Sequence, residues 1–142
     1  MADTFTVKLE GAEELRKQFQ ELVKAVHPDQ VEPVLMKGAR KMAKAIRDKA
    51  SRGPTGNLKK AVKAKQLKRI GFNPAPAIAA VDRKRAPHAG LVEYGHALVR
   101  NGKVVGHVPP HPFFRPAVDE NHIRILGEVT GDIKKMVEGV AK

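Results

Sequence analysis

Few residues in this 142-residue chain have the types and spacing that catalysis requires. Ser51 is the only serine, and the sequence contains neither a Gly-x-Ser-x-Gly turn nor a phosphate-binding Gly-x-x-x-x-Gly-Lys-Ser/Thr loop. Glu93 is a lone carboxylate in an apolar segment, where an ion pair with a nearby Arg or Lys is favoured over a role as acid or base. The sequence therefore predicts a protein that is not an enzyme and uses no cofactor.

The six histidines raise the question of a metal site. His107 and His111 flank a Val-Pro-Pro stretch, and His88 and His96 lie upstream. The chain has no Cys, and the pair at 107 and 111 falls in a proline-locked loop rather than on one face of a helix. We therefore predict no metal ion, and we expect His111 to hydrogen-bond the backbone of its own loop or to pack on Phe113.

Three segments rich in glycine or proline carry most of the information in the chain. They are residues 52–60 (RGPTGNLKK), 88–95 (HAGLVEYG) and 111–121 (HPFFRPAVDEN). Each combines residues that shape the backbone with a few apolar or charged side chains. This combination favours surfaces that fix how chains fit together, so we expect a component of an assembly.

The third segment contains two adjacent aromatic residues. Phe113 and Phe114 cannot both point inward from an extended backbone, because successive side chains alternate in direction. We expect one of them to enter the core and the other to stay near the surface, where aromatic residues and Arg115 anchor interfaces. A local bend that buries both side chains is the alternative.

The net charge of +12 is concentrated in one part of the chain. Residues 37–69 hold 13 Lys or Arg and a single acid, Asp48, whereas the charges of the remaining residues cancel. Such a block attracts nucleic acid or an acidic partner, although a solvated helix face is the plainer interpretation. With few aromatic residues to stack on bases, any contact with duplex DNA is expected to be nonspecific. The candidate contact residues are Lys37, Arg40, Lys41, Lys44, Arg47, Lys59 and Lys60.

Hydrophobic periodicity predicts the elements that position these residues. Residues 4–9 alternate like a strand, residues 15–26 form a helix with one apolar stripe, and Pro28 ends that helix. A second, basic helix is expected over residues 31–50, and a terminal helix begins near Pro116. The predicted inward residues are Leu35, Ala39, Met42 and Ile46 of the second helix, and Ile123, Leu126, Ile133, Val137 and Val140 of the terminal one.

Further strands are predicted over residues 58–67 and 77–81, and a hairpin over residues 98–105. Asn101-Gly102 is the preferred pair for its two-residue type I′ turn, because both positions require positive φ. The fold class predicted from this order is α+β: an antiparallel sheet of about four strands, packed on one face by two or three helices. The length suits a single domain over residues 1–142.

The absence of Cys fits a protein made in a reducing cytoplasm. The N-terminus has no basic region followed by an apolar stretch, and no run of about 18 apolar residues occurs, so no membrane association is expected.

Taken in order, the three segments resemble the neck or tail-completion proteins of long-tailed double-stranded-DNA bacteriophages, in the gene-product-ten family of HK-type lambdoid phages. That family carries a Pro-x-x-Thr-Gly-x-Leu turn, an Ala-x-x-Val-Glu-Phe-Gly segment and a Pro-x-His-Pro-Phe-x-x-Pro-Ala run. The residues that carry the resemblance are Pro54, Thr55, Gly56, Leu58, Val92, Glu93, Tyr94 and Gly95, followed by the run at 109–117.

The resemblance implies a structural virion protein, made in the host cytoplasm, that forms a ring in the neck or tail of a phage or prophage. The ring, expected to be a hexamer, would join head to tail beside head-completion (connector) and tail-terminator proteins, and the genome would pass through it. A ring requires one patch on each subunit to meet a different patch on the next. We expect these contacts at Asn101, Gly102, His111, Phe113, Phe114 and Arg115. The alternative is a small basic protein that binds nucleic acid without sequence preference.

Overall fold

A computed structural model describes residues 11–51, 53 and 55–140 of the chain. The predicted strand at 4–9 and Pro54 lie outside these residues. The elements are α1 (Ala12–Ala25), α2 (Pro28–Lys49), α3 (Asn57–Ala61), β1 (Val62–Gln66), β2 (Ala77–Val81), α4 (Ala89–Tyr94), β3 (His96–Arg100), β4 (Lys103–Val108) and α5 (Phe114–Val140). The predicted α+β class is confirmed. No helix among the described residues is both long enough and apolar enough to cross a membrane.

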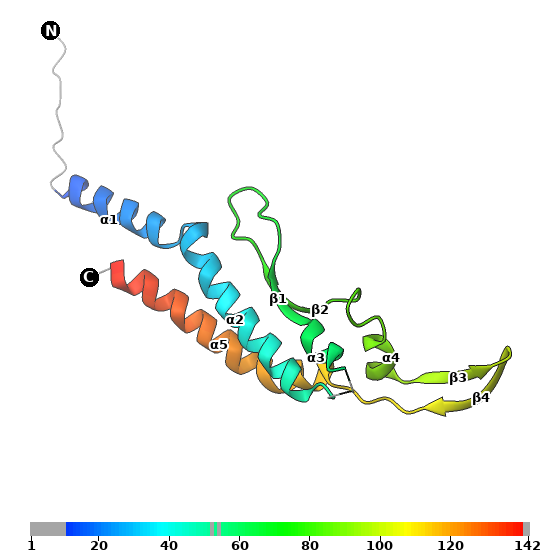
Figure 1. The fold of residues 1–142 in the computed structure, drawn as a ribbon. Coiled ribbons are helices and arrows are strands. Elements are labelled where there is room, and N and C mark those ends of the chain that lie inside the picture. Colours follow the sequence, from blue (N-terminus) through cyan, green and yellow to red (C-terminus); the bar gives the residue numbers. More distant parts are fainter. Residues whose placement is uncertain (1–10, 52, 54, 141–142) are drawn as a thin grey trace, which may run out of the picture.

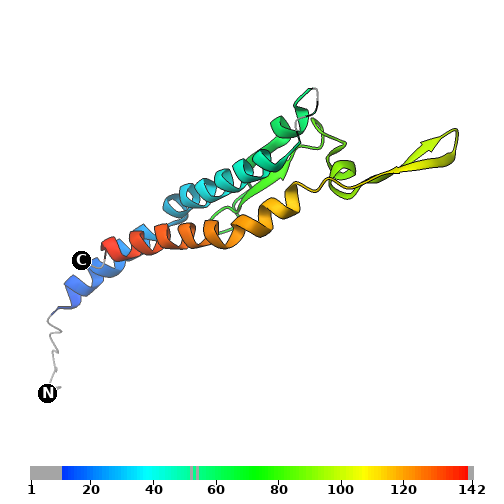
Figure 2. The same ribbon diagram turned by 90° about the horizontal axis from the view of Figure 1, so that it is seen from below.

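The long helix α2 lies at the centre of the fold. It runs beside α5 and also packs against both strands of the β1–β2 hairpin (Figures 1 and 2). The predicted break between the first two helices is confirmed. Pro28 occupies the first position of α2, where its missing N–H has no intrahelical partner to lose.

A glycine allows α2 and α5 to approach closely. A Cβ placed on Gly38 of α2 would lie 2.6 Å from Cγ2 of Val129 on α5, so a larger residue would push the helices apart. The glycines of α5 do not take part in this contact, because a Cβ at Gly127 or Gly131 would meet no atom of the described chain within 4 Å outside its own helix backbone. The tight contact therefore depends on the glycine of the other helix.

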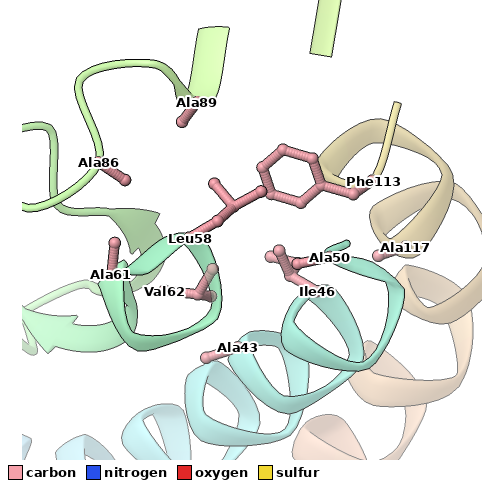
Figure 3. Close-up of a cluster of buried hydrophobic side chains, with 10 residues drawn as sticks. All are labelled: Ala43, Ile46, Ala50, Leu58, Ala61, Val62, Ala86, Ala89, Phe113 and Ala117. Carbon is pink, nitrogen blue, oxygen red and sulfur yellow. The ribbon is translucent and has the colours of Figure 1, made fainter. Parts of the chain in front are cut away.

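The core lies where α2, α3, β1 and the start of α5 meet (Figure 3). The Phe113 ring, 2% exposed, points toward the side chain of Leu58, which is 5% exposed. The other buried members are small or aliphatic: Ala43, Ile46, Ala50, Ala61, Val62, Ala86, Ala89 and Ala117. The core is therefore mostly aliphatic, as the composition predicts, and Phe113 is its largest side chain.

The four described strands form two separate antiparallel pairs rather than one sheet. β1 pairs with β2, with Val62 opposite Val81, and β3 pairs with β4, with His96 opposite Val108. The short helix α4 follows β2 and directs the chain away from the first pair before β3 begins. As a result, the β3–β4 hairpin projects from the body of the molecule (Figures 1 and 2).

The strand predicted over residues 58–67 begins only at Val62. Gly56, with φ of 63°, precedes the short helix α3, and the backbone N–H of Asn57 donates to the Thr55 hydroxyl at 3.4 Å. This turn directs Leu58 into the core instead of along a strand. The fold-motif residues Thr55, Gly56 and Leu58 therefore shape the entry to the first hairpin.

The inward faces of the two long helices were predicted with unequal success. Ala39 and Ile46 of α2 are buried, and Leu35 and Met42 are half-buried, as expected. On α5, the expected inward residues Ile123 and Leu126 are 76% and 60% exposed, so that part of the prediction is wrong. α2 covers the neighbouring face of α5 instead, where Ala117 and Ile125 are buried, while Ile133, Val137 and Val140 are half-buried.

The first helix has a largely uncovered apolar stripe. No residue of α1 is buried, and Leu15, Phe19 and Val23 are each more than half exposed. The described chain covers this stripe only in part, at Leu22, which is half-buried.

Candidate functional site

Two of the motif-bearing segments lie against each other beside the core. The backbone N–H of His111 donates to the carbonyl of Val92 at 2.8 Å, which ties the end of α4 to the proline-rich segment before α5. Gly95 has φ of 71°, and a Cβ there would lie 2.6 Å from the Val108 carbonyl oxygen and 2.9 Å from the Pro110 nitrogen. Only glycine fits this position. We call residues 92–95 together with residues 108–116 the joint.

Glu93 connects the joint to the start of α5. Its carboxylate accepts hydrogen bonds from the backbone N–H groups of Phe113 (2.8 Å), Phe114 (3.0 Å) and Arg115 (3.0 Å). Phe113 directly precedes α5, and Phe114 and Arg115 belong to its first turn, where the N–H groups have no acceptor within the helix. A negative charge at a helix N-terminus is also favoured by the helix dipole. Glu93 therefore caps α5 through backbone groups, whereas the sequence favoured an ion pair with a basic side chain.

The environment of Glu93 keeps its carboxylate ionised. Partial burial raises its pKa, but the hydrogen bonds from the Phe114, Phe113 and Arg115 N–H groups, together with the positive charge of Arg115, outweigh this. The pKa of Glu93 is therefore lowered from its ordinary value of 4.5. The stability that this group contributes is fully present above the unfolded pKa and is lost as the pH falls through the folded pKa.

We expect Glu93→Gln to lower the free energy of unfolding by about 1–2 kcal/mol at neutral pH, because glutamine supplies a single neutral acceptor to three N–H groups. The difference between wild type and variant should shrink as the pH falls from 4.5 through the lower pKa of the folded state, because the wild-type carboxylate is protonated first in the unfolded chain and then in the folded one. Urea unfolding at pH 7 and at acidic pH measures both effects. A constant difference across this range would show that the charge of Glu93 does not stabilise α5.

The aromatic residues of the joint divide as expected for an adjacent pair. Phe113 is buried in the core, while Phe114 is half-buried and packs against the same cluster. Arg115 is exposed, and its guanidinium carbon lies 5.8 Å from the centroid of the Tyr94 ring, within the range of a cation–π contact. The His111 side chain is also exposed, so its contribution to the joint is its backbone N–H.

An open cleft lies beside the joint. Its volume is about 810 Å³, and it is lined by residues of β2, the following turn, α4 and the first turns of α5. The lining is mainly apolar and includes Ala80, Leu91, Tyr94, Phe114 and Val118, with Arg83, Glu93, Arg115 and Asp119 as its charged residues. In the described chain β2 pairs only with β1, so the backbone groups on its other edge have no strand partner.

The β3–β4 hairpin carries the other predicted interface residues. Asn101 and Gly102 form its turn with φ of 49° and 74°, which confirms the positive φ predicted for both positions. The apolar side chains of the hairpin at Leu98, Val99, Val104 and Val105 are exposed, and the register of the two strands shifts between Leu98 and Val99. Val99 and Val104, which lie opposite each other, are 63% and 70% exposed.

The basic residues predicted to meet an anionic partner are only partly free. Three lysines of α2 pair with carboxylates of α5: Lys37 with Asp132 (2.7 Å), Lys41 with Glu128, and Lys49 with Glu120 (2.7 Å). Lys44 pairs with Asp48 within α2 at 2.8 Å. Arg40 and Arg47 are exposed, as is Lys60 of α3, and Lys59 is half-buried. Much of the charge on α2 is therefore balanced within the chain itself.

A comparison with known protein families supports the family resemblance that the sequence motifs indicated. Residues 13–95, more than half of the chain, match the family described as "Bacteriophage HK97-gp10, putative tail-component". No curated protein and no solved structure matches the chain. The chain therefore belongs to the HK97-gp10-like family of phage tail components, which confirms the predicted resemblance. The matched range runs from α1 to Gly95 and so contains the first of the two segments of the joint, residues 92–95.

Proposed function

We propose that this tail component is a subunit of a ring in the phage neck that joins the head to the tail and lets the genome pass. Its mechanism is positioning, with no bond made or broken. The observation that carries the proposal is that one chain presents a hairpin that projects from the body (Figure 1) and exposes apolar side chains. The same chain has an open apolar cleft elsewhere. The ring, its six-fold symmetry and its neighbours, the head-completion and tail-terminator proteins, are parts of this proposal.

The hairpin is poorly suited to remain surrounded by water. An isolated two-stranded hairpin is marginally stable at best, and this one exposes Leu98, Val99, Val104 and Val105 to between 44% and 70%. Fully burying a side chain of this size contributes about 1.5–3 kcal/mol. A partner surface that covers the hairpin would therefore supply both its stability and the driving force for association.

The cleft of a second copy offers a matching surface. It is apolar, and β2 borders it with an edge that has no strand partner in the described chain. An incoming strand can pair with such an edge through backbone hydrogen bonds while its alternate side chains enter the cleft. We propose that the hairpin of one subunit docks in this way beside β2 of the next.

Such a contact favours a ring over a pair. The hairpin and the cleft are different patches, so each subunit that donates its hairpin still has its own cleft available for another copy. A contact of this kind continues from subunit to subunit until the ring closes. Placing it between like subunits also assigns a role to Phe114 and Arg115, which line the cleft.

The alternative function, a small nucleic-acid-binding protein in which the basic block at residues 37–69 is the binding site, has less support. Within this block, Lys37, Lys41 and Lys49 of α2 are each paired with a carboxylate of α5, which lowers the positive potential that α2 offers to DNA. Membership of a family of tail components also favours the structural role.

The double substitution Val99→Asp with Val104→Asp tests the proposed function. Both side chains are exposed and project from the body, so we expect the body of the variant to fold normally even where the two opposed charges weaken the hairpin. Heads and tails should then remain unjoined in a complementation assay. The matched control is Val99→Thr with Val104→Thr, which preserves shape and strand preference and should retain most assembly. Joined, infectious particles from the double-aspartate variant would refute a hairpin contact.

A further inference from the structure

A second basic surface lies apart from the exposed face of α2, on segments brought together around the β1–β2 hairpin. It comprises Lys59 and Lys60 of α3, Lys63 and Lys65 of β1, and the triplet Arg83-Lys84-Arg85 after β2. We call these seven residues the basic cluster. We propose that it contacts the phosphate backbone of duplex DNA, an inference that rests on the proposed function because a neck ring encloses the genome.

The geometry of the hairpin assembles the cluster from two distant parts of the sequence. The backbone N–H of Asp82 donates to the Ala61 carbonyl at 2.8 Å, which places the triplet beside the junction of α3 and β1. The Arg85 N–H donates to the Asp82 carbonyl, and the Lys84 N–H donates to the Asp82 carboxylate at 3.0 Å. The three basic residues are therefore held in a tight turn next to those of α3 and β1.

The β1 lysines face away from the core. Val62 is buried and Ala64 packs against the core, so Lys63 and Lys65, which alternate with them, lie on the opposite, outer face of the hairpin. Across the strand pair they meet Ala80 and Ile78, which carry no charge. The outer face is thus positive without an opposing acid on the neighbouring strand.

The cluster has few acidic neighbours. Between Asp48 and Glu93 the sequence contains one acid, Asp82, whose carboxylate accepts the hydrogen bond of its own turn. The nearest other acids are Asp48, whose pKa the charge of Lys59 helps to lower, and Glu93 and Asp119, which line the cleft with Arg83. Among the described residues, none of the seven basic side chains has a carboxylate within 4.0 Å, in contrast to the paired lysines of α2. An unbalanced positive surface of this kind favours a polyanion.

Duplex DNA is the polyanion that fits best. Lysine and arginine neutralise phosphates without contacting the bases, so the contact does not depend on DNA sequence. This property suits a surface along which the whole genome must pass. Single-strand binding requires aromatic platforms for the bases, and the cluster contains no aromatic residue. The contact is therefore expected to be nonspecific and strongly dependent on salt.

The test compares two triple neutralisations that remove the same charge from the full chain. Lys63→Gln, Lys65→Gln and Lys84→Gln alter the cluster, whereas Arg40→Gln, Lys44→Gln and Arg47→Gln alter α2. Fluorescence anisotropy with a duplex of about 25 base pairs and arbitrary sequence gives affinity as a function of NaCl concentration. We expect the cluster variant to bind at least about tenfold more weakly, with a salt slope reduced by roughly 1 for each residue replaced, and the α2 variant to keep the wild-type slope.

If both variants lose the same affinity for the duplex, only the net charge matters, and the assignment of DNA contact to the basic cluster is overturned. Failure of the wild type to bind the duplex would also overturn it, as would equally tight binding of polyglutamate, which would indicate an acidic protein partner. These outcomes are independent of ring assembly, because binding is measured on the purified protein and joining is measured in particles. If the cluster variant keeps the wild-type salt slope while the double-aspartate hairpin variant leaves tails unjoined, the DNA contact is refuted and the proposed ring function still stands.

Discussion

Replacing Phe113 by alanine is expected to lower the free energy of unfolding by about 3–5 kcal/mol, a large share of the stability of a domain this size. The ring is 2% exposed and meets Leu58 at the junction of α2, α3 and α5 (Figure 3). The surrounding cluster is dominated by alanines, which have no side-chain freedom with which to fill the cavity. Thermal unfolding followed by circular dichroism should show a midpoint lowered by about 10–20 °C.

Phe72→Ala is the matched control, since it removes the same atoms from a side chain that is 96% exposed. It should change stability by no more than about 0.5 kcal/mol. If the two substitutions lower the free energy of unfolding equally, Phe113 does not stabilise the core. Phe113 would then be reassigned to the subunit interface that the sequence predicted.

Gly95→Ala is expected to lower the free energy of unfolding by about 3 kcal/mol or more. It should also separate the two segments of the joint, residues 92–95 and 108–116. The backbone at Gly95 has φ of 71° and ψ of 173°, a region occupied almost exclusively by glycine. The added Cβ would also lie 2.6 Å from the Val108 carbonyl oxygen, and a backbone atom cannot move aside as a flexible side chain could. Hydrogen exchange should then show faster exchange at His111, whose N–H donates to Val92 across the joint.

Gly90→Ala provides the control for this effect. Gly90 lies in α4 close to Gly95, and a Cβ there meets no atom of the described chain within 4 Å. Alanine should be neutral or stabilise the helix by up to about 1 kcal/mol. Wild-type stability and exchange in the Gly95 variant would contradict the close approach of the two segments.

The features that the sequence predicted correctly have local causes. The Asn101-Gly102 turn follows from the positive φ that two adjacent residues must adopt, and the break before α2 follows from Pro28. The family resemblance likewise rests on short motifs read in order. Each of these signals lies within a few residues and needs no knowledge of the packed structure.

The features that the sequence did not predict depend on contacts between distant elements. The lysines of α2 meet acids of α5 that lie 95, 87 and 71 residues further along the chain. Glu93 reaches backbone donors 20 to 22 residues away, and no spacing rule identifies a cap supplied by another helix. The basic triplet 83–85 lies outside the block singled out by charge, and the pairing of β1 with β2 brings it into the cluster.

The inward face of α5 was misassigned for a related reason. The helix carries apolar residues on more than one side, so periodicity alone offered two candidate faces. Packing against α2 selects the face with Ala117 and Ile125 and leaves Ile123 and Leu126 exposed. The choice depends on the small residue Gly38, which sets how closely the two helices approach.

Covalent cross-linking within assembled particles tests the docking of hairpin into cleft most directly. The chain has no natural cysteine, so Val104→Cys on the hairpin and Leu91→Cys in the cleft can be combined without background reaction. Treatment with a short bismaleimide is predicted to give a ladder of products extending beyond the dimer, whereas each single-cysteine variant should give no ladder. A double-cysteine chain that remains monomeric, or that stops at the dimer, would contradict a head-to-tail ring built from these two surfaces.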